Sequence, residues 1–210
     1  MSDTLEFHCA AIQVHIDAII DKLESQPLTP LKDAKPKRAA GAYLLFYRGR
    51  VGVYAIWALL GLPLYSGKTT DMADRLSKHA ESINAAVNLN IDDFMVKYIE
   101  LDDKHAHLAC MFEAAMLKRY SPVWNEELTG FGLKDVGKSR SDSIVSLWDT
   151  YHPGRPKRGE TPNEKTVGEL HAMLVKAARA LALAHNLPPR ILSEEEGCAV
   201  DLLSESLPLF

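Results

Sequence analysis

The 210-residue chain has the length of one domain with small appendages, and its 47% hydrophobic residues are enough for a sizeable core. Its net charge of -4 and its pI of about 6.1 exclude a uniformly basic chain. The acidity is local, because residues 191–210 hold five acidic and no basic side chains, so the other 190 residues carry +1. Binding follows local charged patches, and the net charge therefore does not exclude nucleic acid as a partner.

The cysteines are three, widely spaced and without a CxxC pair, at Cys9, Cys110 and Cys198. This usage argues against a disulfide framework or a zinc cluster and fits a reducing compartment. The first residues are acidic where a signal peptide would be basic. The most apolar run, 51–64, is broken by glycine and proline and is too short to span a bilayer. We expect a cytoplasmic chain without a membrane partner.

The elements are predicted from hydrophobic periodicity and from turn residues. In chain order, the pattern predicts a helix over 4–24, a proline-rich linker over 26–38, a strand over 41–47, a strand or helix over 51–60, a strand over 63–67, a helix over 71–87, a strand over 94–101, and helices over 105–120, 142–149 and 164–185. The order β, β, α, β, α with flanking helices indicates an α+β fold.

Glu113 is the one polar residue in an otherwise apolar segment, residues 109–117, inside the helix expected at 105–120. Burying a lone carboxylate is costly unless it is paired or bound to a cation. The pattern therefore indicates a metal ligand, a surface carboxylate, or a carboxylate paired with a distant arginine.

Arg75 and His79 lie four residues apart, so they share one helix face. Each precedes an apolar residue of the stripe formed by Leu76, Ala80, Ile83 and Val87, which places the pair at the edge of the buried face. Arginine donates two hydrogen bonds to a phosphate, and histidine exchanges a proton near neutral pH. The pair fits phosphate chemistry, and equally an exposed pair on a solvated helix.

The run Gly67-Lys68-Thr69 has the ending of a phosphate-binding loop. That motif needs a glycine five positions before Gly67, where this chain has Leu62, and Gly61 is out of register by one. The spacing disfavours a nucleotide triphosphatase.

Taken together, the motifs occur in a specific order: Gly41-Ala42-Tyr43, Tyr65-Ser66-Gly67, Arg75 with His79, Glu113 and Asn125. Further runs are Gly130-Phe131-Gly132, Trp148-Asp149 and His152-Pro153-Gly154-Arg155. This order resembles the GIY-YIG nuclease superfamily, and within it the small Type II restriction endonucleases that cut the palindrome CCGCGG. The resemblance covers residues 39–158. It implies a small antiparallel or mixed three-stranded sheet flanked by helices, with extra N- and C-terminal helices.

The first signature tyrosine has two candidates. Gly52-Val53-Tyr54 lies ten residues before Tyr65, the separation usual in the superfamily at large. The run from Gly41 to Gly49 resembles the first strand of the restriction subgroup, which carries an insertion between its signature strands. We therefore assign the first signature to Tyr43 rather than to Tyr54.

The resemblance implies hydrolysis of phosphodiester bonds with one Mg²⁺ ion, which suits a site with few carboxylates. Glu113 would hold the ion, and Arg75 would clamp the phosphate. Tyr43 would orient or deprotonate the water; a free phenol with a pKa of about 10 is a poor base, so nearby cations would favour its phenolate and His79 would accept its proton. The other residues implied at the site are Tyr65, Lys68 and Asn125.

Double-stranded DNA is the implied partner. Residues 134–158 carry a local charge of +3 in Gly- and Ser-rich loops, which suits phosphate contacts and readout of guanine in the major groove. With Lys68, the residues expected to bind DNA are Lys134, Lys138, Arg140, Arg155 and Lys157. A palindromic target implies a homodimer, for which the apolar stripes of 4–24 and 164–185 are the candidate surfaces. A restriction enzyme further implies a cognate DNA methyltransferase.

The expected organisation is an N-terminal helix and linker over 1–38, a nuclease domain with recognition loops over 39–158, and a C-terminal helix with an acidic tail over 159–210. The alternatives left open are a homing or repair nuclease of the same superfamily and a catalytically silent DNA-binding module. Homing and repair nucleases usually add a separate DNA-binding domain, for which the remaining sequence is short and acidic.

Overall fold

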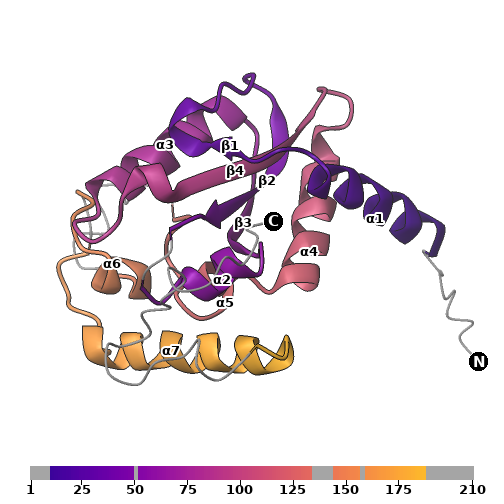
Figure 1. The fold of residues 1–210 in the computed structure, drawn as a ribbon. Coiled ribbons are helices and arrows are strands. Elements are labelled where there is room, and N and C mark those ends of the chain that lie inside the picture. Colours follow the sequence, from indigo (N-terminus) through magenta and orange to yellow (C-terminus); the bar gives the residue numbers. More distant parts are fainter. Residues whose placement is uncertain (1–9, 50–51, 134–143, 157–158, 188–210) are drawn as a thin grey trace, which may run out of the picture.

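The computed structural model describes residues 10–49, 52–133, 144–156 and 159–187. A four-stranded antiparallel sheet lies at its centre, with the strand order β1-β4-β2-β3. Helices cover both faces of this sheet (Figure 1). The strands are β1 (Thr29–Pro30), β2 (Ala40–Tyr47), β3 (Pro63–Thr69) and β4 (Phe94–Leu101).

The helices follow the chain between and after these strands. They are α1 (Ala10–Glu24), α2 (Ala55–Leu59), α3 (Met72–Ala85), α4 (Ala109–Tyr120), α5 (Val123–Glu126), α6 (Leu147–Tyr151) and α7 (Val167–Ala184). Three short 3-10 helices precede or join them: η1 (Leu31–Asp33), η2 (Ile91–Asp93) and η3 (Ala106–Leu108). The predicted α+β class is therefore confirmed.

The sheet separates two hydrophobic cores. The larger core contains Tyr43 and Leu45 of β2 and packs beneath α2, α3, α5 and α7. The smaller core contains Ala42 and Leu44 of β2 and packs against α1 and α4. Side chains alternate between the faces of a strand, so the continuously apolar β2 serves both cores and every one of its residues is buried.

The number of strands differs from the expectation of three. The fourth strand, β1, comes from the segment that proline content predicts to be a linker. Thr29 pairs with Val96 and Pro30 with Met95 at the outer edge of β4, where a proline is tolerated because one side of an edge strand needs no partner. Leu31, which follows, is only 3% exposed and anchors the segment. All strand pairs of this sheet, as far as the structure describes it, are antiparallel, so of the two arrangements that the resemblance left open the sheet has the antiparallel one.

The sequence pattern of residues 51–60 was compatible with either a strand or a helix. In the structure this segment contains the helix α2, Ala55–Leu59. Gly52 and Gly61 on either side have positive φ values of 80° and 64°, which glycine adopts without strain. All five residues of α2 are buried, because the helix lies between the sheet and α7. An amphipathic pattern cannot appear in a helix that is covered all round.

Helix α3 begins at its N-cap Asp71, whose side chain accepts a hydrogen bond from the backbone N–H of Asp74 at 3.0 Å. Leu76 and Ile83 are buried as the apolar stripe predicts, but Val87 lies beyond the end of the helix and is exposed. His79 was expected at the edge of the buried face. It is instead inside the core, at 2% exposure, and the helix thereby carries a polar ring into the sheet's larger core.

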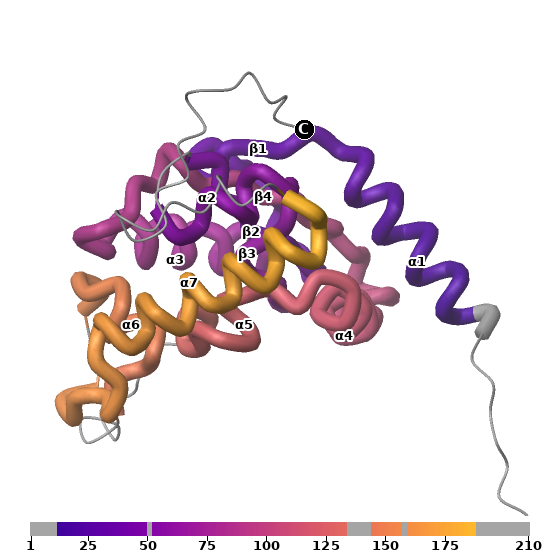
Figure 2. The backbone as a smooth tube through the Cα atoms, turned by 60° about the horizontal axis from the view of Figure 1, so that its bottom comes forward, coloured from indigo at the N-terminus to yellow at the C-terminus, as the bar shows by residue number. Residues whose placement is uncertain are grey.

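The outer helices differ in how they use their apolar residues. Helix α7 begins with a capping box at Thr166 and Glu169, and its stripe is buried within the chain at Leu170, Leu174, Ala178 and Ala182. Helix α1 buries Ile20 and Leu23 against the sheet but stands away from the body at its other end (Figures 1 and 2), with Ile12, Val14 and Ile19 exposed.

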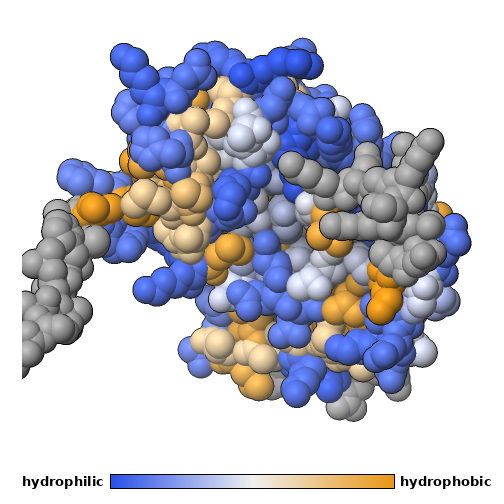
Figure 3. Space-filling view, turned by 180° about the vertical axis from the view of Figure 1, so that it is seen from behind, coloured by the Kyte–Doolittle hydropathy of each residue, from blue (hydrophilic) through white to orange (hydrophobic). Residues whose placement is uncertain are grey.

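Seen from behind the view of Figure 1, the molecular surface has its hydrophobic residues in separate groups among hydrophilic ones (Figure 3). In the part of the chain that the structure describes, none of the helices combines the length and apolar character that crossing a membrane requires.

Candidate active site

The pairing of β2 with β3 brings the two signature segments together. Tyr43 lies directly opposite Gly67, and a Cβ atom on Gly67 would come within 2.5 Å of the Tyr43 hydroxyl oxygen and 2.9 Å of Tyr65 Cε1. Gly41 faces the neighbouring strand as closely, because a Cβ atom there would lie 1.9 Å from the carbonyl oxygen of Ile99. The glycines of both signatures are therefore required by close approach, one to the tyrosines and one to the backbone.

Tyr43, His79 and Arg75 form one hydrogen-bonded group beneath α3. The Tyr43 hydroxyl lies 2.6 Å from Nε2 of His79, and Nε of Arg75 donates to the same hydroxyl oxygen at 3.1 Å. A guanidinium can only donate, so the hydroxyl accepts from Arg75 and its own hydrogen is available for His79. The spacing of Arg75 and His79 on α3 thus places both around a single phenol.

Burial dominates the electrostatics of this group. It raises the pKa of Tyr43 above the ordinary phenol range, although the charge of Arg75 acts in the opposite direction. Burial and the charges of Arg75 and Arg155 hold the pKa of His79 well below its usual value. The histidine is therefore neutral and able to accept a proton, but the expectation that nearby cations give a phenolate is not met in the free chain.

Tyr65 stands beside this group. Its ring lies 6.2 Å from that of Tyr43 and 5.5 Å from that of His79, between ring centroids. Burial raises the pKa of its phenol, against the charge of Arg75. Gly132 packs on it so closely that a Cβ atom would meet the Tyr65 hydroxyl at 1.9 Å, and Nη2 of Arg75 donates to the Gly132 carbonyl at 2.5 Å.

Glu113 is not an isolated carboxylate. Its Oε2 atom lies 2.7 Å from Nζ of Lys68, and the side chain is 21% exposed. The hydrogen bond to Glu113 raises the pKa of Lys68. The partner lies on β3, 45 positions earlier, so the local sequence of α4 could not reveal it. Glu113 also stands near enough to Tyr65 for its charge to raise the pKa of that phenol, which connects the ion pair with the tyrosine group.

Glu113 is the residue of this site that could hold a metal ion. A carboxylate has two oxygens, and the ion pair uses Oε2, so the group can also bind a cation. Among the residues that the structure describes, no three His, Cys, Asp or Glu side chains gather into a ligand set. With one carboxylate from the protein, Mg²⁺ would have to complete its shell with water and substrate phosphate.

Asn125, which the resemblance implies at the site, bonds to the backbone of β3. Its Oδ1 accepts from the backbone N–H of Ser66 at 2.8 Å, and its Nδ2 donates to the Ser66 carbonyl at 2.9 Å. β3 is an edge strand, so its outer backbone groups lack a strand partner, and the side-chain amide pairs with them instead. Asn125 thus fixes the signature strand rather than contacting Tyr43.

The rival tyrosine, Tyr54, lies in a different part of the larger core. Its hydroxyl is 2.7 Å from Nε2 of His152, and Nδ1 of that histidine is 2.8 Å from the Asn88 side-chain oxygen. Tyr54 is 4% exposed and lies among Trp57 and Trp124. Arg75 lies against Tyr43, which supports assigning the first signature to Tyr43.

The residues expected to bind DNA fall into three groups. Lys68 lies at the site, half exposed and paired with Glu113. Arg155 is 9% exposed, and its guanidinium donates to Asp149 and to the carbonyls of Gly130 and Phe131, so its donors are used inside the protein and we no longer assign it to DNA. The others lie outside the described residues: Lys134, Lys138, Arg140 and Lys157.

Two neighbours of the site had no role in the sequence analysis. Phe131 stacks on His79 with 4.5 Å between ring centroids and an interplanar angle of 16°. The Gly132 carbonyl holds Arg75. The run Gly130-Phe131-Gly132 was visible as a motif, but its contacts with α3 depend on the tertiary fold.

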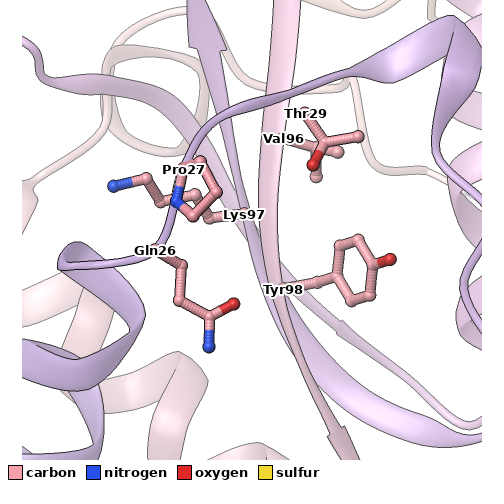
Figure 4. A pocket seen from close by; sticks show the side chains of 6 residues that line it. All are labelled: Gln26, Pro27, Thr29, Val96, Lys97 and Tyr98. Carbon is pink, nitrogen blue, oxygen red and sulfur yellow. The ribbon is translucent and has the colours of Figure 1, made fainter.

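A surface hollow of about 150 Å³ lies away from these residues, along β1 and β4 (Figure 4). Its lining is Gln26, Pro27, Thr29, Val96, Lys97 and Tyr98. It holds none of the groups described above, and β3, which carries Tyr65 and Lys68, is at the opposite edge of the sheet. We therefore place the chemistry at β3 and α3 rather than in this hollow.

Residues 62–178 match the model of the Eco29kI GIY-YIG domain family. The matched segment is more than half of the chain; it begins after Tyr43 and contains Tyr65, Arg75, His79 and Glu113. A search among curated proteins finds no match.

Proposed function

Because the chain belongs to the Eco29kI GIY-YIG family and is thus a DNA endonuclease, we propose that it is a Type II restriction enzyme that uses one Mg²⁺ ion. The substrate is double-stranded DNA with a specific, GC-rich palindrome, of which CCGCGG is the candidate that the sequence resemblance supplies. Hydrolysis forms a bond between a water oxygen and phosphorus and breaks the bond from phosphorus to a sugar oxygen.

The observation that carries the proposal is the convergence of Tyr43, His79 and Arg75 on one hydroxyl oxygen. Arg75 supplies a fixed positive charge to a phosphate that gains charge in the transition state. His79, neutral because of burial, receives the proton of Tyr43 as the phenol takes one from water. Tyr43 is fully buried in the free chain, so we expect the attacking water to reach it only in the DNA complex.

Glu113 would hold the Mg²⁺ ion, which when bound polarises the phosphate and stabilises the leaving oxygen. Lys68, half exposed, would then exchange Glu113 for a phosphate oxygen, because an ammonium beside a cation is repelled. Tyr65 would complete the wall that faces the phosphate. Asn125 would keep β3, which carries Tyr65 and Lys68, in register.

The test is cleavage of plasmid or phage DNA by the wild type and the E113Q protein, with and without Mg²⁺. Wild type should give discrete fragments only with the metal, and E113Q should bind DNA but not cut it. E127Q, at an exposed position, is the matched control and should cut normally. Cleavage by E113Q near the wild-type rate with Mg²⁺ would remove Glu113 as the metal ligand. Absence of cleavage of any DNA by wild type would favour the silent DNA-binding module.

The proposed assembly is a symmetric homodimer, because one site cuts one strand and a palindrome presents two equivalent bonds. The apolar stripe of α7 is used within the chain, so the candidate interface narrows to α1. Ile12, Val14 and Ile19 are exposed apolar residues of this helix, whose N-terminal end stands away from the body (Figure 2). Sedimentation should show a dimer that I12E/I19E converts to a monomer; a wild-type monomer, free and on a palindromic duplex, would contradict it.

A restriction role also implies a cognate methyltransferase that protects the host's copies of the site. Of the segment 134–158, expected to contact phosphates and read bases, residues 134–143 and 157–158 lie outside the described residues, as does the acidic tail 191–210. A homing or repair nuclease is the second candidate within the family. Sequencing the ends of the fragments separates the two, because a restriction enzyme yields one short palindrome at every cut.

A further inference from the structure

Arg155 lies at the centre of a buried cluster next to the proposed active site. Its Nε and Nη2 atoms donate to the Asp149 carboxylate at 2.8 to 2.9 Å, and the side chains of the pair are 6% and 5% exposed. Its guanidinium carbon lies 4.5 Å from the centroid of the Trp148 ring. Burial raises the pKa of Asp149, against the charge of Arg155. Burying such a pair costs desolvation energy, so its net contribution to stability is small. The contacts that the pair makes with neighbouring segments therefore matter more than the pair itself.

The guanidinium reaches beyond this ion pair to two backbone carbonyls. Nη1 donates to the Phe131 carbonyl at 2.8 Å, and Nη2 donates to the Gly130 carbonyl at 3.1 Å. The backbone N–H of Trp148 donates to the Thr129 carbonyl at 3.0 Å on the same stretch. Three consecutive carbonyls, from 129 to 131, are therefore fixed by α6 and by the turn that follows it. A lysine could supply the charge but not the fork that meets both Asp149 and the carbonyls.

The segment fixed in this way makes the contacts that orient the two groups on α3. The Phe131 ring stacks on His79 at 4.5 Å, and the neighbouring Gly132 carbonyl accepts from Arg75 at 2.5 Å. The turn that carries Arg155 is also docked on the end of α3. The Val87 N–H donates to the Pro153 carbonyl at 2.9 Å, and a Cβ atom on Gly154 would meet the Ala85 carbonyl at 2.0 Å. α6 accordingly lies beside α3 (Figures 1 and 2).

We propose that Arg155 is a positioning residue of the endonuclease, acting through Phe131 and Gly132 on His79 and Arg75. It clamps one end of the segment to α6 while the other end presses on α3, so that a neutral histidine ring and a guanidinium keep fixed places around the Tyr43 hydroxyl. Its role in catalysis rests on the proposed nuclease function. Its role in orienting His79 does not, because that role is a property of the free protein.

The test compares wild type with R155K, which keeps the positive charge beside Asp149 but loses the forked contacts. Y151F is the matched control, because it removes the Tyr151–His171 hydrogen bond of 2.7 Å from the neighbouring α6–α7 packing and touches neither carbonyl. Two readouts are needed: the NMR resonance of the His79 Cε1–H in the free protein, which the stacked Phe131 ring shifts, and steady-state cleavage. A double-mutant cycle with F131L measures whether Arg155 and Phe131 act together.

The expected result is a changed His79 resonance in R155K and an unchanged one in Y151F. In R155K, kcat should fall about tenfold or more while KM stays within about twofold, because binding is kept and orientation is lost. R155K and F131L should also be non-additive in kcat. If R155K does not fold, D149N serves instead, since it keeps the arginine but removes its anchoring charge, and the same changes are expected.

An unchanged His79 resonance in folded R155K, or additive effects of R155K and F131L on kcat, would overturn the positioning role. If R155K shifts the His79 resonance but the wild-type protein cuts no DNA, the positioning role is supported and the nuclease proposal is refuted. The two failures can therefore be told apart.

Discussion

Two tyrosine–histidine pairs are buried in the same core, and they differ in what lies around them. Tyr43 and His79 are 2.6 Å apart, and Tyr54 and His152 are 2.7 Å apart. Burial lowers the pKa of both histidines, that of His152 to about 3, and in both the charge of Arg155 acts in the same direction. By distance and burial alone, the two pairs could not be distinguished.

The third partner separates them. The Tyr43 hydroxyl also accepts from Arg75, a cation that suits a phosphate, and stands in the same group as Tyr65 and the Lys68–Glu113 ion pair. The second ring nitrogen of His152, Nδ1, is hydrogen-bonded to the side-chain oxygen of the neutral Asn88 amide. Nδ2 of Asn88 donates in turn to the Tyr151 carbonyl. One pair therefore leads to charged groups that reach the surface, and the other ends in a neutral network that closes on the backbone.

The largest expected effect separates the pairs by activity. Y43F should reduce the rate of DNA cleavage about 1000-fold, because it removes the hydroxyl through which a proton can pass to His79. Y54F should cut close to the wild-type rate. Single-turnover cleavage with excess enzyme measures both. The reverse pattern, with Y54F inactive and Y43F active, would transfer the first signature to Tyr54.

Y54F, which should leave cleavage almost unchanged, should reduce the stability of the fold. Y54F leaves Nε2 of the buried His152 without its partner, so the free energy of unfolding should fall by about 1–3 kcal/mol. Urea denaturation at pH 7 measures this loss. Unchanged stability would mean that the second pair does not hold this part of the core.

Gly67 provides a further test, because it closely approaches Tyr43 of the first pair and neither residue of the Tyr54–His152 pair. The added methyl of G67A would lie 2.5 Å from the Tyr43 hydroxyl oxygen, so the phenol must shift and cleavage should fall about 100-fold. G168A is the control, since a Cβ atom there meets nothing within 4 Å and alanine favours the helix. Equal activity of G67A and G168A would show that Tyr43 can move without loss.

The last expected effect is a pH dependence that the two pairs share. Both histidines have pKa values lower in the folded protein than the unfolded value of about 6.5, so the unfolded state binds more protons below that pH. Their contribution to stability is complete above pH 6.5 and is lost as pH falls towards the folded values. At pH 5 the neutral His152, with a folded pKa of about 3, should cost about 2 kcal/mol of stability.

H152N, which cannot titrate at this position, should therefore lose less stability between pH 7 and 5 than wild type. H15N, at an exposed histidine of α1, should follow the wild-type curve. Urea denaturation at pH 7, 6 and 5 provides the comparison. Parallel curves for wild type and H152N would show that His152 is not held neutral by the fold.

The sequence by itself determined the elements that have a local signal. The period of 3.6 in residues 71–87 and the alternation in 94–101 predicted α3 and β4, because one face of each is buried and the other is not. The four-residue spacing of Arg75 and His79 predicted that they share one face of that helix. The α+β class followed from the order of these elements.

Only the tertiary structure decided the partners. Glu113 looked isolated because Lys68 lies on another element, and Arg155 looked like a surface cation because Asp149 and the carbonyls of Gly130 and Phe131 meet it only in the fold. The sequence favoured Tyr43 over Tyr54, but it could not show that both tyrosines are buried and bonded to a histidine, or that only Tyr43 of the two accepts from Arg75. Burial, pairing and pKa depend on what surrounds a side chain in three dimensions, and local spacing along the chain carries no record of those neighbours.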